Sequence, residues 1–136
     1  MSGRFLDSDV VLCLLDDGPK ADAAGALVAG GGWISVQVLD EVLVNCRRKA
    51  GMTWDEADVF LDGVRALCPV ADVTARTHDV GRALGARYGL QVYDGMIAAA
   101  ALLAGCDEVL SEDMHDGLLV EGTLRIRNPF AGMAEG

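Results

Sequence analysis

Short apolar runs alternate along the chain with longer stretches whose apolar residues recur at helical spacing. The runs have the length of strands, and glycine, proline or acidic residues mark most of their ends. The apolar run at residues 10–15 is broken by residues 16–19 and is assigned to no element. We expect short strands at residues 4–6, 33–35, 69–71, 108–110 and 124–126.

The helical stretches carry recognisable start and stop signals. Pro19 suits the first position of one helix, and Thr53 with Glu56 forms a capping box at the start of another. Asp94 is expected to cap the last helix, which Gly105 closes. The expected helices cover residues 19–28, 36–50, 54–67, 74–88 and 94–104.

This alternation of strands and helices predicts an α/β fold with a mostly parallel sheet covered on both faces. The chain of 136 residues suits one domain with its own core, and the pattern shows neither a repeat nor a linker. In such sheets ligands bind outside the carboxyl ends of the strands. Acidic residues that fall at this edge are therefore candidates for a functional site.

The formal net charge of −10 is spread over both halves of the chain. This charge disfavours binding to nucleic acids or anionic membranes through bulk electrostatics. A substrate that carries phosphate would need a bound cation or a local cluster of arginines.

The four cysteines are widely spaced, and with only two histidines they make no zinc-binding pattern. We expect them to be buried thiols of a cytoplasmic protein. Acidic residues near the N-terminus argue against a signal peptide, and the longest apolar run is too short to span a membrane.

Three acidic residues from distant parts of the chain are expected at the same sheet edge. Asp7 follows the first strand directly, Asp113 follows the fourth strand closely, and Asp94 begins a helix. Glu41 is a fourth candidate in the middle of a helix, where it shares a narrow polar stripe with Gln37, Asn45 and Arg48. The stripe can face either a cleft or solvent.

Clustered carboxylates repel one another, and a hard divalent cation is the commonest reason for keeping them together. Mg²⁺ or Mn²⁺ would offset the negative charge, allow a phosphodiester to bind, and activate water. Three or four of these carboxylates, from Asp7, Asp94, Asp113 and the fourth candidate Glu41, could bind such an ion and form a catalytic site.

Four segments stand out along the chain, in the order "FLDSDVVLCLL", "ISVQVLDEVLVNCRRK", "YGLQVYDGMIAAAALLAGCDEVLSEDMHDG" and "RIRNPF". Taken together, they resemble PIN-domain ribonucleases, and VapC-type toxins of toxin–antitoxin pairs in particular. The resemblance implies a Rossmann-like α/β/α sandwich over residues 1–136 that acts as a single PIN-like nuclease domain. It also implies RNA cleavage that depends on Mg²⁺ or Mn²⁺, a small antitoxin partner and a homodimer.

The resemblance places metal ligands at the four acids named above and a helper hydroxyl at Ser111. Ser8 and Asp9 depart from the Thr-Asn pair that the family usually has after its first acid, so Asp9 adds a carboxylate beside Asp7. Asp9, Asn45 and Asp116 are possible accessory residues. Arg47 and Arg48 are candidates for contacting RNA, although basic residues also suit the end of a helix.

Two other functions are compatible with the sequence. Asp7-Ser8-Asp9 has the look of the nucleophile loop of haloacid-dehalogenase-type phosphatases, which also need a lysine, and Lys49 is the one reasonable candidate. That reading leaves Glu41 and Asp94 without a role. The second alternative is a non-catalytic PIN-like module that binds a metal or a partner.

Overall fold

The computed structural model describes residues 3–133. Strands and helices alternate along most of the chain, as the pattern of apolar positions predicts. In order, the elements are β1 (Gly3–Leu6), α1 (Ser8–Leu12), the 3-10 helix η1 (Cys13–Leu15), α2 (Pro19–Ala29), β2 (Ile34–Ser35), α3 (Val36–Arg48), α4 (Trp54–Leu67), β3 (Val70–Ala71), α5 (Ala75–Tyr88), α6 (Val92–Leu103), β4 (Cys106–Leu110), β5 (Leu119–Val120) and β6 (Leu124–Arg127).

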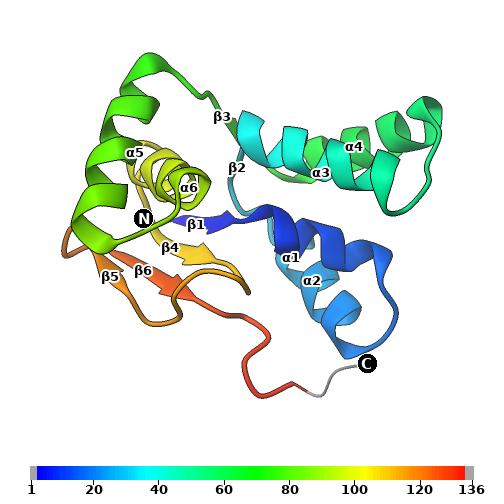
Figure 1. Ribbon diagram of the computed structural model, residues 1–136. Helices are drawn as coiled ribbons and strands as arrows, with labels where there is room; N and C mark the ends of the chain where they lie inside the picture. Colours follow the sequence, from blue (N-terminus) through cyan, green and yellow to red (C-terminus); the bar gives the residue numbers. More distant parts are fainter. Residues whose placement is uncertain (1–2, 134–136) are drawn as a thin grey trace.

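The main sheet has the strand order β1-β4-β6-β5, in which only the β5–β6 pair is antiparallel. β2 and β3 form a second, parallel pair, and a parallel bridge between Phe5 and Trp33 joins this pair to β1. Figure 1 shows α5 and α6 on one side of the molecule and α1 to α4 on the other, with the carboxyl ends of β1 and β4 directed toward α1. The expected α/β fold with a mostly parallel sheet is confirmed.

The core is centred on a row of side chains that crosses three neighbouring strands. Phe5, Val109 and Ile126 are partners in the strand register, and each is fully buried. The next residues on two of these strands, Leu6 and Leu110, are also buried. Burial of successive residues on a strand requires cover on both faces of the sheet, which explains why both residues at the ends of β1 and β4 are apolar.

The two helices on one side of the sheet pack with their backbones close together. A Cβ atom added at Gly95 of α6 would lie 2.7 Å from the carbonyl oxygen of Gly81 in α5. Ala98 to Ala101 of α6 are buried as well, so small side chains permit this close approach. The packing fixes the start of α6, which carries Asp94.

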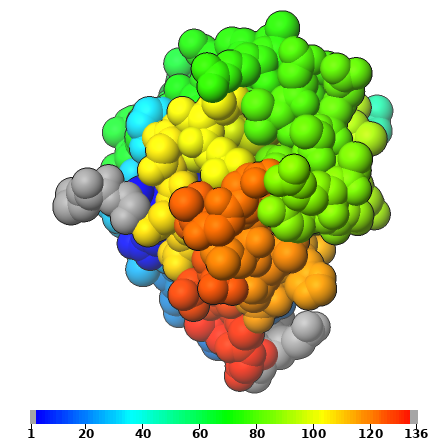
Figure 2. Space-filling view, turned by 90° about the vertical axis from the view of Figure 1, so that its left-hand side faces the viewer, coloured from blue at the N-terminus to red at the C-terminus, as the bar shows by residue number. Residues whose placement is uncertain are grey.

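The β5–β6 hairpin lies against the C-terminal end of α5. The backbone N–H of Glu121 donates a hydrogen bond of 2.8 Å to the Tyr88 hydroxyl, and Arg87 pairs with the Glu121 carboxylate at 2.8 Å. In Figure 2 these two segments form one continuous surface, with residues of α5 in green and the hairpin in orange.

Three short elements were not predicted from the sequence. Residues 8–12 form a short helix, α1, continued by η1, where no element was assigned; Asp7 caps α1, and Val10 and Val11 are buried. The two-residue strand β5 was also not predicted, because its pairing with β6 is its only sheet contact.

Candidate active site

Asp7 lies where the two central strands end. Leu6 and Leu110 are register partners at the carboxyl ends of β1 and β4, and the backbone N–H of Asp7 donates to the Leu110 carbonyl at 3.0 Å. The chain then turns into α1, whose N-terminus Asp7 caps by accepting a 2.7 Å hydrogen bond from Ser8 N–H. Hydrogen bonds to the backbone of β4 and of α1 therefore fix the position of Asp7.

The loop after β4 also contacts Asp7. Ser111 is fully buried, and its hydroxyl donates to Asp7 Oδ2 at 2.8 Å. Asp7 itself is only 6% exposed. The predicted helper hydroxyl is thus in contact with the first predicted acid, and Asp113 follows two residues later on the same loop.

Asp9 holds this loop in place. Its Oδ2 atom accepts hydrogen bonds from the backbone N–H groups of Glu112 and Asp113, both at 3.0 Å, and lies 3.3 Å from the Ser111 hydroxyl. Its other oxygen, Oδ1, is buried without a hydrogen-bond partner among the described residues. The extra carboxylate noted in the sequence therefore positions the segment that carries Asp113.

Glu41 reaches the site from α3. This helix begins directly after β2, where the buried Ser35 side chain accepts a 3.3 Å hydrogen bond from Val38 N–H. Glu41 is half-buried, and within the described chain its Oε1 atom is buried with no hydrogen-bond partner. The polar stripe on α3 therefore faces the site at Glu41, while Arg48 at its end is exposed.

Asp94 lies in the first turn of α6 and does not cap it. Gln91 occupies the N-cap position without a side-chain hydrogen bond, so the expectation of an Asp94 cap is wrong. The helix starts earlier because Val92 and Tyr93 already adopt helical geometry before the acid. A carboxylate in a first turn is still favoured by the helix dipole.

The acids act on one another electrostatically. The pKa of Asp7 is raised by burial and, further, by the charge of Asp113. The pKa values of Glu41 and Asp94 are raised by burial first and by the negative charge of Asp7 next. Burial, Asp7 and Asp113 together raise the pKa of Asp9 to about 7. Carboxylates from separate segments thus converge around Asp7.

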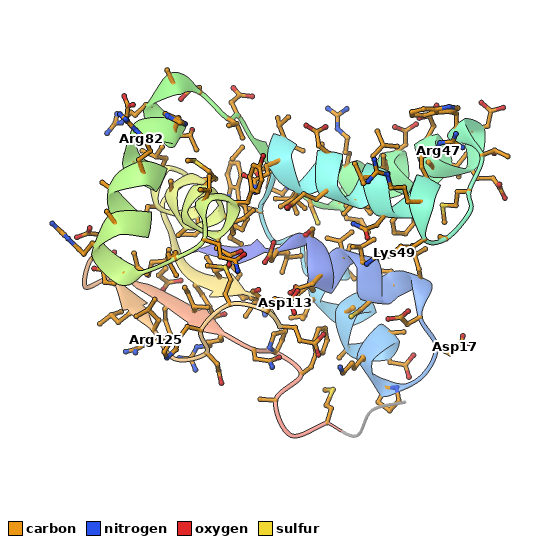
Figure 3. All side chains as sticks on the ribbon, in the orientation of Figure 1. Asp17, Arg47, Lys49, Arg82, Asp113 and Arg125 are labelled. Atoms are coloured by element: carbon orange, nitrogen blue, oxygen red, sulfur yellow. The ribbon has the colours of Figure 1, made fainter. Side chains whose placement is uncertain are left out.

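Two hollows of about 550 Å³ and 500 Å³ meet at this cluster, because Ser8 and Asn45 line both. The larger one is also lined by Asp9, Asp113 and Lys49, and the smaller one by residues that include Gln37, Glu41 and Tyr93. In Figure 3 Asp113 lies near the start of α1, and Arg47 and Arg82 lie at opposite ends of the molecule.

The remaining predicted residues have other contacts. Asp116 accepts a hydrogen bond of 2.8 Å from Asn128 N–H at the end of β6. The Asn45 side chain donates to the Glu41 carbonyl at 2.8 Å and lines both hollows. Arg47 donates to the Met52 carbonyl at 2.7 Å and stacks over the Trp54 ring at 4.5 Å, which joins α3 to α4.

Several residues that line the hollows were not among the predicted site residues, and they include Ser8, Lys49 and Tyr93. Ser8 and Tyr93 are direct sequence neighbours of Asp7 and Asp94, and this adjacency is the signal that could have identified them. Lys49 was considered for the phosphatase alternative and as part of a basic helix end, but its sequence position gave no sign of a hollow beside it.

A PIN domain model matches residues 4–115 of the sequence. The chain belongs to the PIN domain family. This membership decides against the haloacid-dehalogenase alternative, and the Asp9 carboxylate is in any case engaged by the loop after β4.

Solved structures with the same PIN fold include toxin–antitoxin proteins. A toxin–antitoxin complex from Klebsiella pneumoniae is 16% identical with a TM-score of 0.71, over 93% of this chain and 97% of that one. DNA-bound VapBC from Salmonella typhimurium is 21% identical with a TM-score of 0.70, over 95% and 99%. VapC20 from Mycobacterium tuberculosis, a sarcin–ricin loop cleaving toxin, is 20% identical with a TM-score of 0.65, over 81% and 89%. The search of curated proteins gave no match.

None of the helices within residues 3–133 combines the length and apolar character that crossing a membrane requires.

Proposed function

We propose that this PIN domain is a divalent-metal-dependent ribonuclease and the toxin of a VapC-type toxin–antitoxin pair. The observation that carries the proposal is the effect of the Asp7 charge on three other carboxylates, Asp9, Glu41 and Asp94, which come from three different helices. Such mutual repulsion in a partly buried site is costly to the fold, and perturbed acids of this kind concentrate at functional sites.

The donor set fits a hard cation. Asp7, Glu41, Asp94 and Asp113 are the proposed ligands of Mg²⁺ or Mn²⁺, which prefer oxygen donors. Buried oxygens of Asp9 and Glu41 lack partners within residues 3–133, so the site has unused acceptor capacity. No group of three acidic, histidine or cysteine side chains in this range forms a ready-made metal cage. Mg²⁺ commonly keeps several waters and uses one or two carboxylates together with substrate phosphate, so a cage is not required.

When bound, the cation would polarise the phosphodiester and lower the pKa of a water molecule. The residues of the chain supply the geometry. Ser8 and Ser111 hold Asp7 by hydrogen bonds, and Asp9 holds the loop that carries Asp113. The raised pKa of Glu41 and its oxygen without a partner suit it to accept a proton from the attacking water.

The choice of RNA and of a protein partner rests on the structural neighbours. VapC20 is described as cleaving the sarcin–ricin loop, and the Klebsiella and Salmonella structures are toxin–antitoxin assemblies. By analogy of fold and family, the proposal includes an RNA substrate, a small cognate antitoxin and a homodimer.

The test is cleavage by the purified chain. Total RNA, tRNA and a ribosomal stem-loop are incubated with Mg²⁺, with Mn²⁺ or with EDTA, beside the Asp7→Asn variant. We expect defined fragments with metal only, and none from the variant. Cleavage in EDTA, or equal cleavage by Asp7→Asn, contradicts the metal-dependent mechanism. No cleavage of any RNA contradicts the ribonuclease assignment and favours the non-catalytic module.

The toxin role has its own test. Expression of the chain in bacteria is expected to slow growth, and co-expression of a cognate small partner is expected to restore it. Normal growth with a protein that cleaves RNA in vitro contradicts the toxin role and leaves the nuclease standing.

A further inference from the structure

An exposed aromatic ring lies beside the acidic cluster. Tyr93 precedes Asp94 in the first turn of α6, is 68% exposed, and lines the 500 Å³ hollow together with Glu41. Of the aromatic side chains within residues 3–133, only Trp54 is comparably exposed, at 58%, and it lines neither of the two hollows. Tyr93 is therefore the exposed aromatic side chain of the site.

The surroundings of Tyr93 suit a flat, uncharged group. Its backbone carbonyl accepts a 3.1 Å hydrogen bond from the Gln37 side chain, which ties the start of α6 to α3. Val44, which is 47% exposed, lines the same hollow and adds apolar surface. The side-chain amides of Gln37 and Asn45 also line it and can bond to polar edges.

Away from the proposed cation, the charges at this hollow disfavour phosphate as its occupant. Asp40 and Glu41 contribute carboxylates to its lining, which contains no lysine or arginine. The adjoining 550 Å³ hollow differs, because Lys49 is part of its wall. An RNA strand that passes the acids can thus place backbone toward Lys49 and a base toward Tyr93.

We infer that Tyr93 stacks on an unpaired base of the RNA substrate next to the bond that is cleaved. The inference rests on the proposed ribonuclease function and assigns a base-contacting residue beside its acidic cluster. Aromatic rings stack on any base that is not already stacked in a duplex, and such contacts add affinity without phosphate charge. For a chain with a net charge of −10, base stacking offsets the scarcity of basic residues.

The test compares Tyr93→Ala, Tyr93→Phe and Trp54→Ala on an RNA that the wild type cleaves. Tyr93→Ala is expected to raise KM by roughly 5- to 150-fold, the range for loss of one stacked base. Tyr93→Phe keeps the ring and should stay near wild type, and Trp54→Ala is the matched control for an exposed aromatic away from the hollows. Thermal melting and Mn²⁺ affinity of the Tyr93 variants should equal those of the wild type.

A second arm removes the base in place of the ring. A series of RNAs, each with one abasic nucleotide, is assayed with wild type and Tyr93→Ala. At one position, removal of the base should raise the KM of the wild type as much as the Tyr93→Ala change does. The same abasic RNA should cause no further rise in KM in Tyr93→Ala, because the effects of removing two groups in contact are not additive.

An unchanged KM in Tyr93→Ala overturns the inference, as does full additivity at every abasic position. So does a Tyr93→Phe variant as impaired as Tyr93→Ala, because the phenol and not the ring would then matter. If Tyr93→Ala does not fold, the abasic series with the wild type decides. The inference is then overturned if no abasic position near the cleaved bond weakens cleavage. A wild type that cleaves no RNA overturns this inference and the proposed function together, whereas all the other outcomes leave the ribonuclease intact.

Discussion

The two sides of the molecule use charged residues in opposite ways. Around α5 and the β5–β6 hairpin, acids are paired with arginines: Glu121 with Arg87 at 2.8 Å, and Asp79 with Arg82 at 3.1 Å. At the carboxyl ends of β1 and β4, carboxylates lie close to other carboxylates, and burial raises their pKa values. Both regions are rich in acids, yet only one of them is electrostatically frustrated.

This difference separates structural charges from functional ones. Exposed ion pairs contribute little to stability and can be exchanged or lost without consequence. Unpaired, partly buried carboxylates destabilise the metal-free fold, and a bound cation is the physical reason to keep them. The number of acids does not distinguish the two regions, but their partners do.

The largest expected effect comes from removing an acid of the site. Asp7→Asn should lower metal-dependent RNA cleavage by at least about 100-fold, the scale for loss of one preorganised electrostatic group. Glu41→Gln, Asp94→Asn and Asp113→Asn should act in the same direction. Initial rates at limiting Mn²⁺ measure this. If Glu41→Gln cleaves like wild type at low metal concentration, Glu41 is not a metal ligand and α3 contributes none of the proposed ligands.

The next effect concerns the pH dependence of stability without metal. Asp9 has a pKa raised to about 7 in the fold, from an ordinary value of 3.8, so the folded state binds its proton more tightly than the unfolded state does. Protonation of Asp9 therefore stabilises the fold, and this stabilisation is fully present below about pH 4 and is lost as the pH rises through about 7.

Asp9→Asn removes the charge and keeps the contacts, since an amide oxygen can still accept the hydrogen bonds of the loop. The variant therefore isolates the effect of the Asp9 charge on stability. In EDTA at pH 8 the variant should be more stable than wild type, by on the order of 1–3 kcal/mol, and the advantage should shrink toward pH 5. Urea unfolding at several pH values measures both. A variant that is less stable than wild type at pH 8 shows that the charge of Asp9 supports the loop.

A smaller effect is expected for Asp94→Asn. The change relieves repulsion by Asp7 but gives up a favourable interaction with the helix dipole, so stability in EDTA should change by less than about 1 kcal/mol. The stabilisation that Mn²⁺ gives should be smaller than in wild type, because binding to the folded state stabilises it by mass action. Equal Mn²⁺-induced shifts in melting temperature would place Asp94 outside the metal site.

The smallest effect belongs to the paired region. Glu121→Gln removes a surface ion pair with Arg87 and should cost less than about 1 kcal/mol. RNA cleavage should remain at the wild-type rate. A loss of cleavage in this variant would show that an acid of the paired region is also functional, and would contradict the comparison of the two regions.

The sequence predicted the order of most strands and helices because their ends carry local signals, such as the Thr53–Glu56 capping box, which the structure contains. It also predicted that Asp7 and Asp113 lie at one sheet edge, since parallel strands end on the same side. The helix α1 was missed because residues 10–15 are apolar without a period. The true start of α6 was missed because its N-cap residue, Gln91, makes no side-chain capping bond.

The role of Asp9 could not be predicted from local sequence. Its hydrogen bonds reach Glu112 and Asp113, more than a hundred positions along the chain, and depend on the pairing of β1 with β4. Asp116 likewise meets Asn128 only after β6 has joined the sheet. Contacts of this kind come from tertiary structure, which the pattern of residues specifies only in outline.

The most direct test of the account is a crystal structure of the protein with Mn²⁺, using the anomalous scattering of the metal. We expect an ion bound by at least two of Asp7, Glu41, Asp94 and Asp113. An ion held by Asp7 and Asp9 alone, or ions only at exposed acids such as Asp55 and Asp58 of α4, would contradict the proposed metal site.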